Sequence, residues 1–218
     1  MDGVRSWAGF VADNLDGVLE RSLEHLTLVA GVMVAATLFS VVLGIVLMDR
    51  PVARQAALGA AGVLLTIPSL ALFAVFIPLV GIGNRPAQIA LFLYAILPIL
   101  RNTVTGLGSV DEAVVESARG MGMGPLQQLL RVRVPLAWPV VMAGVRVSTQ
   151  LVTGIAAIAV LVGGGGLGAY IQRGLTSLGN PFSIERVWTG TVFIILLALV
   201  LDAVLGLIGR RTTSPGIR

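Results

Sequence analysis

Residues 109–135 read SVDEAVVESARGMGMGPLQQLLRVRVP, and they form the one long polar stretch of an otherwise strongly apolar chain. Ser109 and Glu112 have the S-x-x-E spacing of a capping box, which predicts the start of a helix. This helix is expected to run through Ala118 and to end at the alternating glycines 120, 122 and 124.

A second helix is expected directly after these glycines. Pro125 suits its first turn, and Pro135 is expected to end it. Its apolar residues fall on one face, namely Leu126, Leu129 and Leu130. Because the whole stretch is too polar to enter lipid, the sequence predicts a helix–glycine turn–helix element that offers an acid, small residues and an apolar stripe to a soluble partner.

On both sides of this element the chain is apolar enough to cross a membrane. Apolar residues make up 56% of the 218 residues, charged residues 12%, and the mean hydropathy is +0.94. A soluble domain has about a quarter charged residues, and a spanning helix needs roughly 20 apolar residues. We therefore predict an all-α integral membrane protein with five spans, at about 26–48, 56–80, 86–107, 138–162 and 187–208. A different division of residues 56–107 is a six-span alternative.

The two ends of the chain fall outside this membrane domain, which we place at residues 26–211. In residues 1–25, apolar side chains such as Trp7 and Phe10 recur at helical spacing with acids between them. This pattern predicts an amphipathic helix on the membrane surface. Residues 212–218 are expected to be a C-terminal tail.

All fifteen basic residues are arginines, and their distribution predicts the orientation in the membrane. An odd number of spans puts the termini on opposite sides. One side then holds Arg50, Arg54, Arg119, Arg131, Arg133, Arg210, Arg211 and Arg218, and the other holds Arg5, Arg21, Arg85, Arg173 and Arg186. Eight against five favours a cytoplasmic C-terminus and an external N-terminus. Since loop arginines account for the pI near 10.9, nucleic-acid binding is not expected.

A few polar residues interrupt the predicted spans. Arg101, Arg146 and Asp202 fall near the predicted cytoplasmic ends, where each either snorkels to the surface or pairs with another helix. The chain has no cysteine and one histidine, His25, which excludes thiolate chemistry and a histidine cluster for a metal. We expect His25 to be an interfacial polar residue, and we expect no metal site and no catalytic residue.

The polar stretch resembles the E-A-A loop of binding-protein-dependent ABC importer permeases, E-A-A-x3-G-x9-I-x-L-P. Here the pattern is Glu116-Ser117-Ala118, three residues, Gly122, nine residues, and Val-Arg-Val-Pro at 132–135. Every spacing is kept, with Ser for the second-position Ala and Val for Ile and Leu. The stretches TIPSLAL at 66–72, LYAILPILRNT at 93–103 and GGGGLG at 163–168 look like permeases for osmoprotectants such as glycine betaine, carnitine or choline. Methionine-importer permeases share the small size and parts of this pattern, so a type I ABC permease for another small solute, such as methionine, is the alternative function.

The resemblance implies a five-helix core of a type I ABC importer in the bacterial inner membrane. It also implies a second permease copy or a sister permease, a cytoplasmic ATPase dimer that binds ATP and magnesium, and an extracytoplasmic substrate-binding protein. The permease itself is then non-catalytic and binds no cofactor. Contacts with the ATPase are expected from Glu116, Ser117, Ala118, Gly120, Gly122, Pro125, Leu126, Leu129, Arg131 and Pro135.

Two further sites are expected in the fourth span and after it. Small and β-branched residues favour close helix approach and an apolar gate, for which the candidates are Gly154, Ile155, Ile158 and Val160, together with the kink prolines Pro68 and Pro98. The glycines at 163–168 are either a flexible external turn or, as the resemblance implies, part of a surface that faces the binding protein. The candidates for that surface are Gly165, Gly166, Tyr170 and Arg173.

Two alternatives from other classes remain open. A self-contained secondary transporter or channel usually carries charged or polar ion sites near the midplane and its own inverted repeats, and neither is clear in this sequence. A structural scaffold would leave the loop spacing unexplained. The sequence identifies neither the solute nor the choice between a homodimer and a heterodimer.

Overall fold

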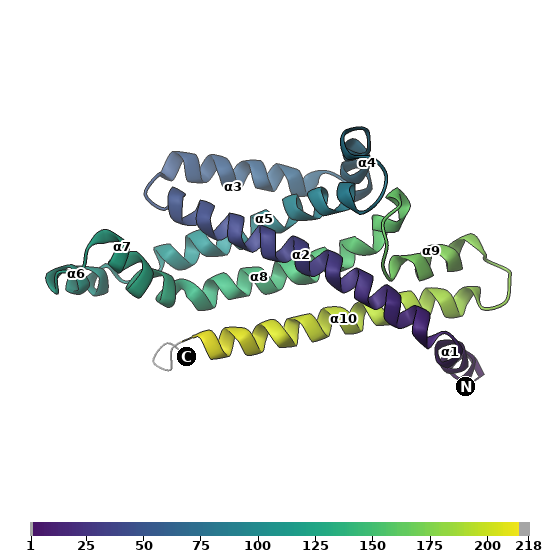
Figure 1. Ribbon diagram of the computed structural model, residues 1–218. Coiled ribbons are helices and arrows are strands. Elements are labelled where there is room, and N and C mark those ends of the chain that lie inside the picture. Colours follow the sequence, from purple (N-terminus) through teal and green to yellow (C-terminus); the bar gives the residue numbers. More distant parts are fainter. Residues whose placement is uncertain (1, 214–218) are drawn as a thin grey trace.

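The computed structural model describes residues 2–213, and all regular structure in that part of the chain is helical (Figure 1). The predicted tail at 212–218 therefore lies mostly outside the described residues. The α-helices are α1 (Asp2–Asp13), α2 (Leu15–Leu47), α3 (Pro51–Thr66), α4 (Ser69–Val80), α5 (Asn84–Gly108), α6 (Glu112–Gly120), α7 (Pro125–Gln128), α8 (Val134–Ala156), α9 (Gly168–Thr176) and α10 (Ser183–Thr212). A π-helical turn, η1 (Leu129–Arg133), and a 3-10 helix, η2 (Ala157–Val162), flank α8.

Four helical segments in residues 2–213 are long and apolar enough to cross a membrane: α2, α5, residues 125–162 and α10. A fifth span is made if α3 and α4 count as one, although their axes are bent by 100°. The predicted all-helical membrane fold is thereby confirmed, and the described residues offer no sixth span.

The bend between α3 and α4 follows from Pro68. A proline disfavours helical geometry in the residue before it, and Ile67 is accordingly extended, with φ −74° and ψ 130°. The break frees the carbonyl of Ile67, and the hydroxyl of the buried Tyr94 on α5 donates to it at 2.7 Å. A side chain of the neighbouring span thus satisfies a backbone group that lipid could not.

Two element boundaries differ from the expected ones. Helix α2 begins at Leu15 and not at residue 26, so the expected surface segment is divided between α1 and the first turns of a spanning helix. Pro135 does not end a helix, since it lies in the first turn of α8, and residues 125–162 run on as one helical segment. Inside a helix a proline lacks the N–H for one backbone hydrogen bond, and a π-helical turn such as η1, directly before α8, is the kind of irregularity that accompanies it.

Helix α5 is the centre of the bundle and packs against α2, α3, α4 and α8. Small residues let the backbones approach closely. A Cβ added to Gly144 on α8 would lie 2.8 Å from the carbonyl oxygen of Pro98, and one added to Gly106 would lie 2.9 Å from that of Ala137. Helix α10, by contrast, lies on the outside of the bundle, against α8 and α9.

The molecule has two distinct ends (Figure 1). The loop end holds α6 and α7 together with the last residues of α2 and of α10, and the glycine-loop end holds α1, α4, α9 and residues 163–168. The described arginines divide between these ends as the sequence predicted, with Arg50 and Arg210 near one and Arg21 and Arg173 near the other. The side of the membrane that each end faces stays a prediction.

Candidate functional site

The polar loop, residues 109–135, begins with a cap that differs from the predicted one. Asp111 caps α6, because its Oδ1 accepts from the backbone N–H of Ala113 at 2.9 Å. Ser109 instead closes α5, where its hydroxyl donates to the carbonyl of Gly106 at 2.9 Å. The predicted capping box of Ser109 and Glu112 is therefore wrong, since the N-cap position belongs to the aspartate two residues after Ser109.

Gly122 ends α6 through a Schellman motif. The N–H of Gly122 donates to the carbonyl of Arg119 at 2.9 Å, and that of Met123 donates to the carbonyl of Ala118 at 3.1 Å. This pair of hydrogen bonds requires a left-handed backbone conformation at the residue directly after the C-cap. That residue is Gly122, which has φ +84°. The glycine of the sequence pattern is thus explained by backbone geometry, and the predicted helix–glycine turn–helix order is confirmed.

Two glutamines that the sequence analysis did not single out hold α7 in place. The side-chain oxygen of Gln127 accepts from the N–H of Gly124 at 3.2 Å, and the amide of Gln128 donates to the carbonyl of Met123 at 2.7 Å. Gln128 is buried. A glutamine at the third position of a helix is a known cap partner, so the spacing from Gly124 to Gln127 was an available signal.

An ion pair attaches α6 to the π-helical turn. The guanidinium of Arg133 lies 3.1 Å from the carboxylate of Glu112, and Val115 and Ala118 are buried on the inner side of α6. Ala118 therefore packs within the chain itself and does not face outward. The two short helices and the start of the fourth span form one packed unit.

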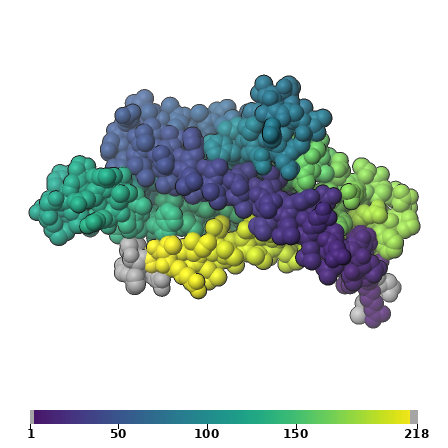
Figure 2. All heavy atoms as spheres, in the orientation of Figure 1, coloured from purple at the N-terminus to yellow at the C-terminus, as the bar shows by residue number. Residues whose placement is uncertain are grey.

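The outer surface of this unit is exposed. Glu116, Ser117, Gly120, Gly122, Pro125 and Arg131 are all exposed, while Leu129 and Pro135 are half-buried. An exposed patch of large apolar side chains accompanies the acid, and we define it as Val114, Met121, Leu126 and Leu130. Met121 is 72% and Leu126 67% exposed. In Figure 2 the loop stands out as a lobe beyond the membrane-spanning part. Several exposed large apolar side chains on such a lobe indicate a protein-binding surface.

The glycine loop, residues 163–168, is held at both sides by hydrogen bonds. The N–H of Gly166 donates to the carboxylate of Glu24 on α2 at 2.9 Å, and that of Gly165 donates to the side chain of Asn84 on α5 at 2.9 Å. Arg21 in turn pairs with Glu24 at 2.8 Å. The loop is therefore a fastened connection between three spans and not a free turn.

This packing separates the four residues predicted to face a binding protein. Arg173 is exposed and Gly165 half-buried, whereas Gly166 and Tyr170 are buried. Tyr170 packs with Phe10 and Val18, and this burial raises the pKa of its hydroxyl. Among the four, only Arg173 offers an exposed side chain.

His25 lies inside the protein, so its predicted interfacial position is wrong. It is fully buried, and its Nε2 lies 3.0 Å from the carbonyl oxygen of Thr153 on α8. A carbonyl only accepts, so Nε2 is the donor. Its other nitrogen faces Gly166. The side chain thus packs between α2, α8 and the glycine loop, a contact that no local pattern indicates.

The predicted gate residues fall into separate places. Gly154 is exposed near the end of α8, while Ile155, Ile158 and Val160 are half-buried there and in η2. Pro68 lies at the break between α3 and α4. Pro98 packs against Gly144, ten residues from Gly154 and hence about 15 Å away along α8. The structure does not bring Pro98 next to the other candidates.

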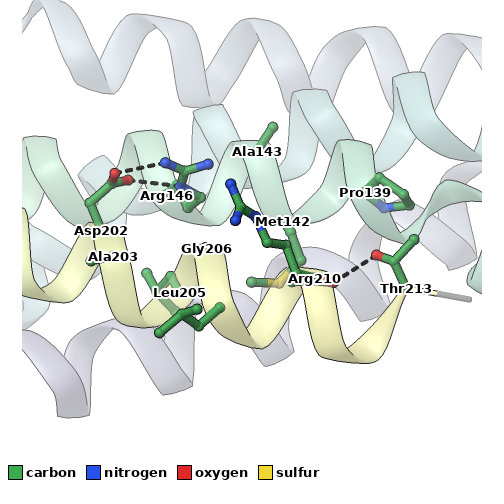
Figure 3. A pocket seen from close by; sticks show the side chains of 12 residues that line it. Pro139, Met142, Ala143, Arg146, Asp202, Ala203, Leu205, Gly206, Arg210 and Thr213 are labelled. Carbon is green, nitrogen blue, oxygen red and sulfur yellow. Dashed lines mark hydrogen bonds and ion pairs between the residues drawn. The ribbon is translucent and has the colours of Figure 1, made fainter. Parts of the chain in front are cut away.

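Arg146 and Asp202 form an ion pair between α8 and α10 (Figure 3). The guanidinium donates from Nε at 2.8 Å and from Nη2 at 2.7 Å, one bond to each carboxylate oxygen. The inter-helix pair that the sequence analysis kept open beside snorkelling is thus confirmed for these two residues. The pair lies at one end of an open groove of about 710 Å³ between the two helices.

Comparison with known proteins identifies relatives over most of the chain. Residues 36–214 match the family described as binding-protein-dependent transport system inner membrane component. The choline transport system permease protein OpuBB of Bacillus subtilis is 41% identical over 209 residues, 96% of this chain and 94% of the relative. The glycine betaine/carnitine/choline permease protein OpuCB of the same organism is 40% identical over the same shares. A solved inward-facing structure of the MetNI methionine ABC transporter has a TM-score of 0.77 at 23% identity, covering 90% of this chain and 96% of that chain.

Proposed function

The chain belongs to the family of inner-membrane components of binding-protein-dependent transport systems and is a permease subunit of an ABC importer, and we propose that its solute is a small quaternary-amine osmoprotectant. Glycine betaine, carnitine and choline are the candidates, because relatives at 40–41% identity are permeases for these solutes. The likeness to the methionine transporter is one of fold, at 23% identity, and gives no reason to propose methionine.

The exposed outer surface of the polar loop is the observation that carries the mechanism. A cytoplasmic ATPase would receive the apolar patch and Glu116, in the manner of a helix that docks into a groove. We propose that ATP and magnesium bind to that ATPase and that this chain is non-catalytic. The loop end then faces the cytoplasm, which places the C-terminus inside and α1 outside, in agreement with the arginine distribution.

The continuous helical segment at residues 125–162 would transmit movement of the ATPase to the membrane domain. A movement of α7 with the ATPase carries the fourth span with it, because no flexible linker separates them. At the far end of this segment lie η2 and the glycine loop, near the predicted gate. Rocking of such rigid elements around a path between two permease chains is the general way in which alternating access is achieved. A binding protein would deliver the solute at the glycine-loop end.

Reconstitution in liposomes with a candidate ATPase and binding protein tests this function. Glu116→Lys is expected to leave the protein inserted and to lower solute uptake about tenfold, as expected for the reversal of a desolvated interfacial charge. Asp49→Lys is the matched control, since Asp49 is an exposed acid at the same end but outside the polar loop. Normal uptake by Glu116→Lys would refute the docking surface, and uptake that persists without any ATPase would refute the importer assignment.

A further inference from the structure

The Arg146–Asp202 pair lies deep within the spanning helices. Arg146 is twelve residues after Val134, the first residue of α8, and Asp202 is ten residues before Thr212, the last of α10. At 1.5 Å per residue these positions are about 18 Å and 15 Å from the helix ends, in a bilayer whose hydrocarbon core is about 30 Å thick. Counted from Trp138 and Ile208, where the predicted spans begin and end, the same positions are about 12 Å and 9 Å inside the membrane. The pair therefore lies within the hydrocarbon core, on the loop-end side.

A pair at this depth needs polar surroundings, and the groove supplies an opening to water. The side chains of Arg146 and Asp202 are 44% and 21% exposed. Charged residues within spans face the bundle interior or a water-filled cavity, since lipid does not solvate them. The groove runs from the pair along α8 and α10 to Arg210 and Thr213 at the loop end (Figure 3). It thus connects the ion pair, within the membrane, with the loop end.

Two glycines on α10 line this groove. A Cβ added to Gly206 would lie 3.8 Å from the guanidinium carbon of Arg146, and one added to Gly209 would lie 3.7 Å from Met142. The remaining lining near the pair is largely apolar, with Met142 and Leu205. A volume of about 710 Å³ is within the range of about 300–1,000 Å³ of small-molecule sites.

We infer that this groove is the inward-facing part of the solute path on this chain, and that the Arg146–Asp202 pair is a transient contact for a zwitterionic quaternary amine. The inference rests on the proposed function and adds the contact residues to it. A quaternary ammonium has no N–H, so it approaches the Asp202 carboxylate by charge alone and leaves the two hydrogen bonds of the pair intact. A solute carboxylate would bind the Nη1 donors of Arg146, which the pair does not use.

The side chains that line the groove suit weak, transient binding of the solute and not tight binding. The solute's methyl groups would contact Met142 and Leu205, and no aromatic side chain is among the described residues that line the groove. Tight sites for quaternary amines use aromatic faces, whereas a transport path must bind weakly enough to release. A charged pair beside aliphatic side chains meets that requirement.

Thiol labelling tests whether the groove is open to water. The chain has no cysteine, so single replacements need no altered background. Ala203→Cys lies in the groove, and Val200→Cys is the matched control, because both residues are exposed on α10, three residues apart, and Val200 does not line the groove. In inverted membrane vesicles, a charged thiol reagent is expected to label Ala203→Cys about tenfold faster, since lipid excludes the reagent. Equal rates at both sites would overturn the inference.

Solute selectivity tests the contact itself, in proteoliposomes that contain the ATPase and saturating binding protein. Arg146→Gln is expected to lower uptake of glycine betaine and carnitine about tenfold more than uptake of choline, since choline has no carboxylate for the guanidinium to bind. Asp202→Asn is expected to lower uptake of all three, since each carries the cation. Equal losses for all solutes with Arg146→Gln would show a purely structural pair and overturn the assignment.

A double variant separates folding from transport. Arg146→Met with Asp202→Leu removes both charges together, and such replacements often preserve stability. It is expected to assemble, to keep binding-protein-stimulated ATP hydrolysis and to lose most uptake. Unchanged uptake would overturn the contact. If the unaltered protein transports no quaternary amine, the proposed function fails, whereas the labelling result still decides whether the groove is aqueous.

Discussion

Two glycine-rich segments lie at opposite ends of this protein and use their glycines in opposite ways. At the loop end, a Cβ added to Gly120, Gly122 or Gly124 would have no described atom within 4 Å. At the other end, each added Cβ in the glycine loop would meet the chain: on Gly164 it would lie 2.8 Å from the carbonyl oxygen of Ala159, and on Gly165 2.7 Å from Glu24. Glycine content alone therefore does not distinguish an exposed turn that can contact a partner from a turn that packs tightly within the chain.

The difference has a physical cause in what surrounds each backbone. In the glycine turn at 120–124, only Gly122 has a positive φ, and its role is to end α6 in the correct direction. In the glycine loop the space is taken by carbonyl groups of η2 and by Glu24 and His25 of α2. Substitutions should therefore affect stability at the glycine loop and coupling to a partner at the glycine turn.

The largest effect is expected from Gly168→Ala. The new methyl group would collide with the carbonyl of Ala157, and backbone atoms cannot yield as a flexible side chain can. We expect a loss of about 3 kcal/mol in the free energy of unfolding, at the upper end for overpacking. Thermal unfolding in detergent, followed by size-exclusion chromatography, measures it. A midpoint equal to that of the unaltered protein would contradict the packing described for this loop.

A smaller loss is expected from Glu24→Gln, which weakens the fastening of the same loop. The carboxylate accepts from Gly166 and pairs with Arg21, and a hydrogen bond to a charged group contributes about 2 kcal/mol. Glu20→Gln, one turn earlier on α2 and exposed, is the control. Comparable unfolding midpoints for both variants would show that the fastening is not needed, and limited proteolysis of residues 163–168 provides a second measurement.

Gly122→Asp tests the glycine turn with a moderate effect on stability and a larger one on transport. A left-handed backbone costs a residue with a side chain about 1 kcal/mol. Because the surroundings are open, the protein is expected to insert and to remain folded. Uptake driven by ATP should nevertheless fall, since the Schellman turn sets the direction of α7. A variant that transports normally would contradict the role of this turn.

The smallest effect is expected from Gly120→Ala, the counterpart of Gly168→Ala at the other end. Gly120 is the last residue of α6 and exposed, so a methyl group finds space and slightly favours the helix. We expect the free energy of unfolding to change by no more than about 0.5 kcal/mol. A loss similar to that of Gly168→Ala would remove the distinction between the two segments.

Features that depend on local patterns were predictable from the sequence. The apolar runs located the spans, and the spacing of Gly122 and Pro125 located the turn and the second helix. The orientation of α4 at 100° to α3 was not predictable, because Pro68 indicates a break without its angle. The N-cap of α6 was also ambiguous in the sequence, because Ser109 and Asp111 are both suitable N-cap residues. Only the structure shows that Asp111 is the one used.

Most contacts between segments that are distant in the sequence could not be predicted from local patterns. The burial of His25 depends on Thr153 and on the glycine loop, more than a hundred residues later in the chain. Likewise, the continuation of α7 into α8 depends on a π-helical turn that no pattern indicates. For Arg146 and Asp202, the sequence showed two costly residues and left pairing open as one of two explanations, and the structure shows that the two meet.

The π-helical turn at Leu129–Arg133 accommodates one extra residue between the polar loop and the fourth span. A turn of this kind holds one residue more than an α-helical turn, and one residue corresponds to about 100° of rotation around a helix axis. The wider turn absorbs its extra residue, because five residues there cover nearly the same rotation as four in an α-helix. Deleting one residue here would restore a regular helix and leave the face of α7 in nearly the same direction relative to α8. The apolar patch therefore keeps the direction that a regular helix would give it, although the segment holds one residue more.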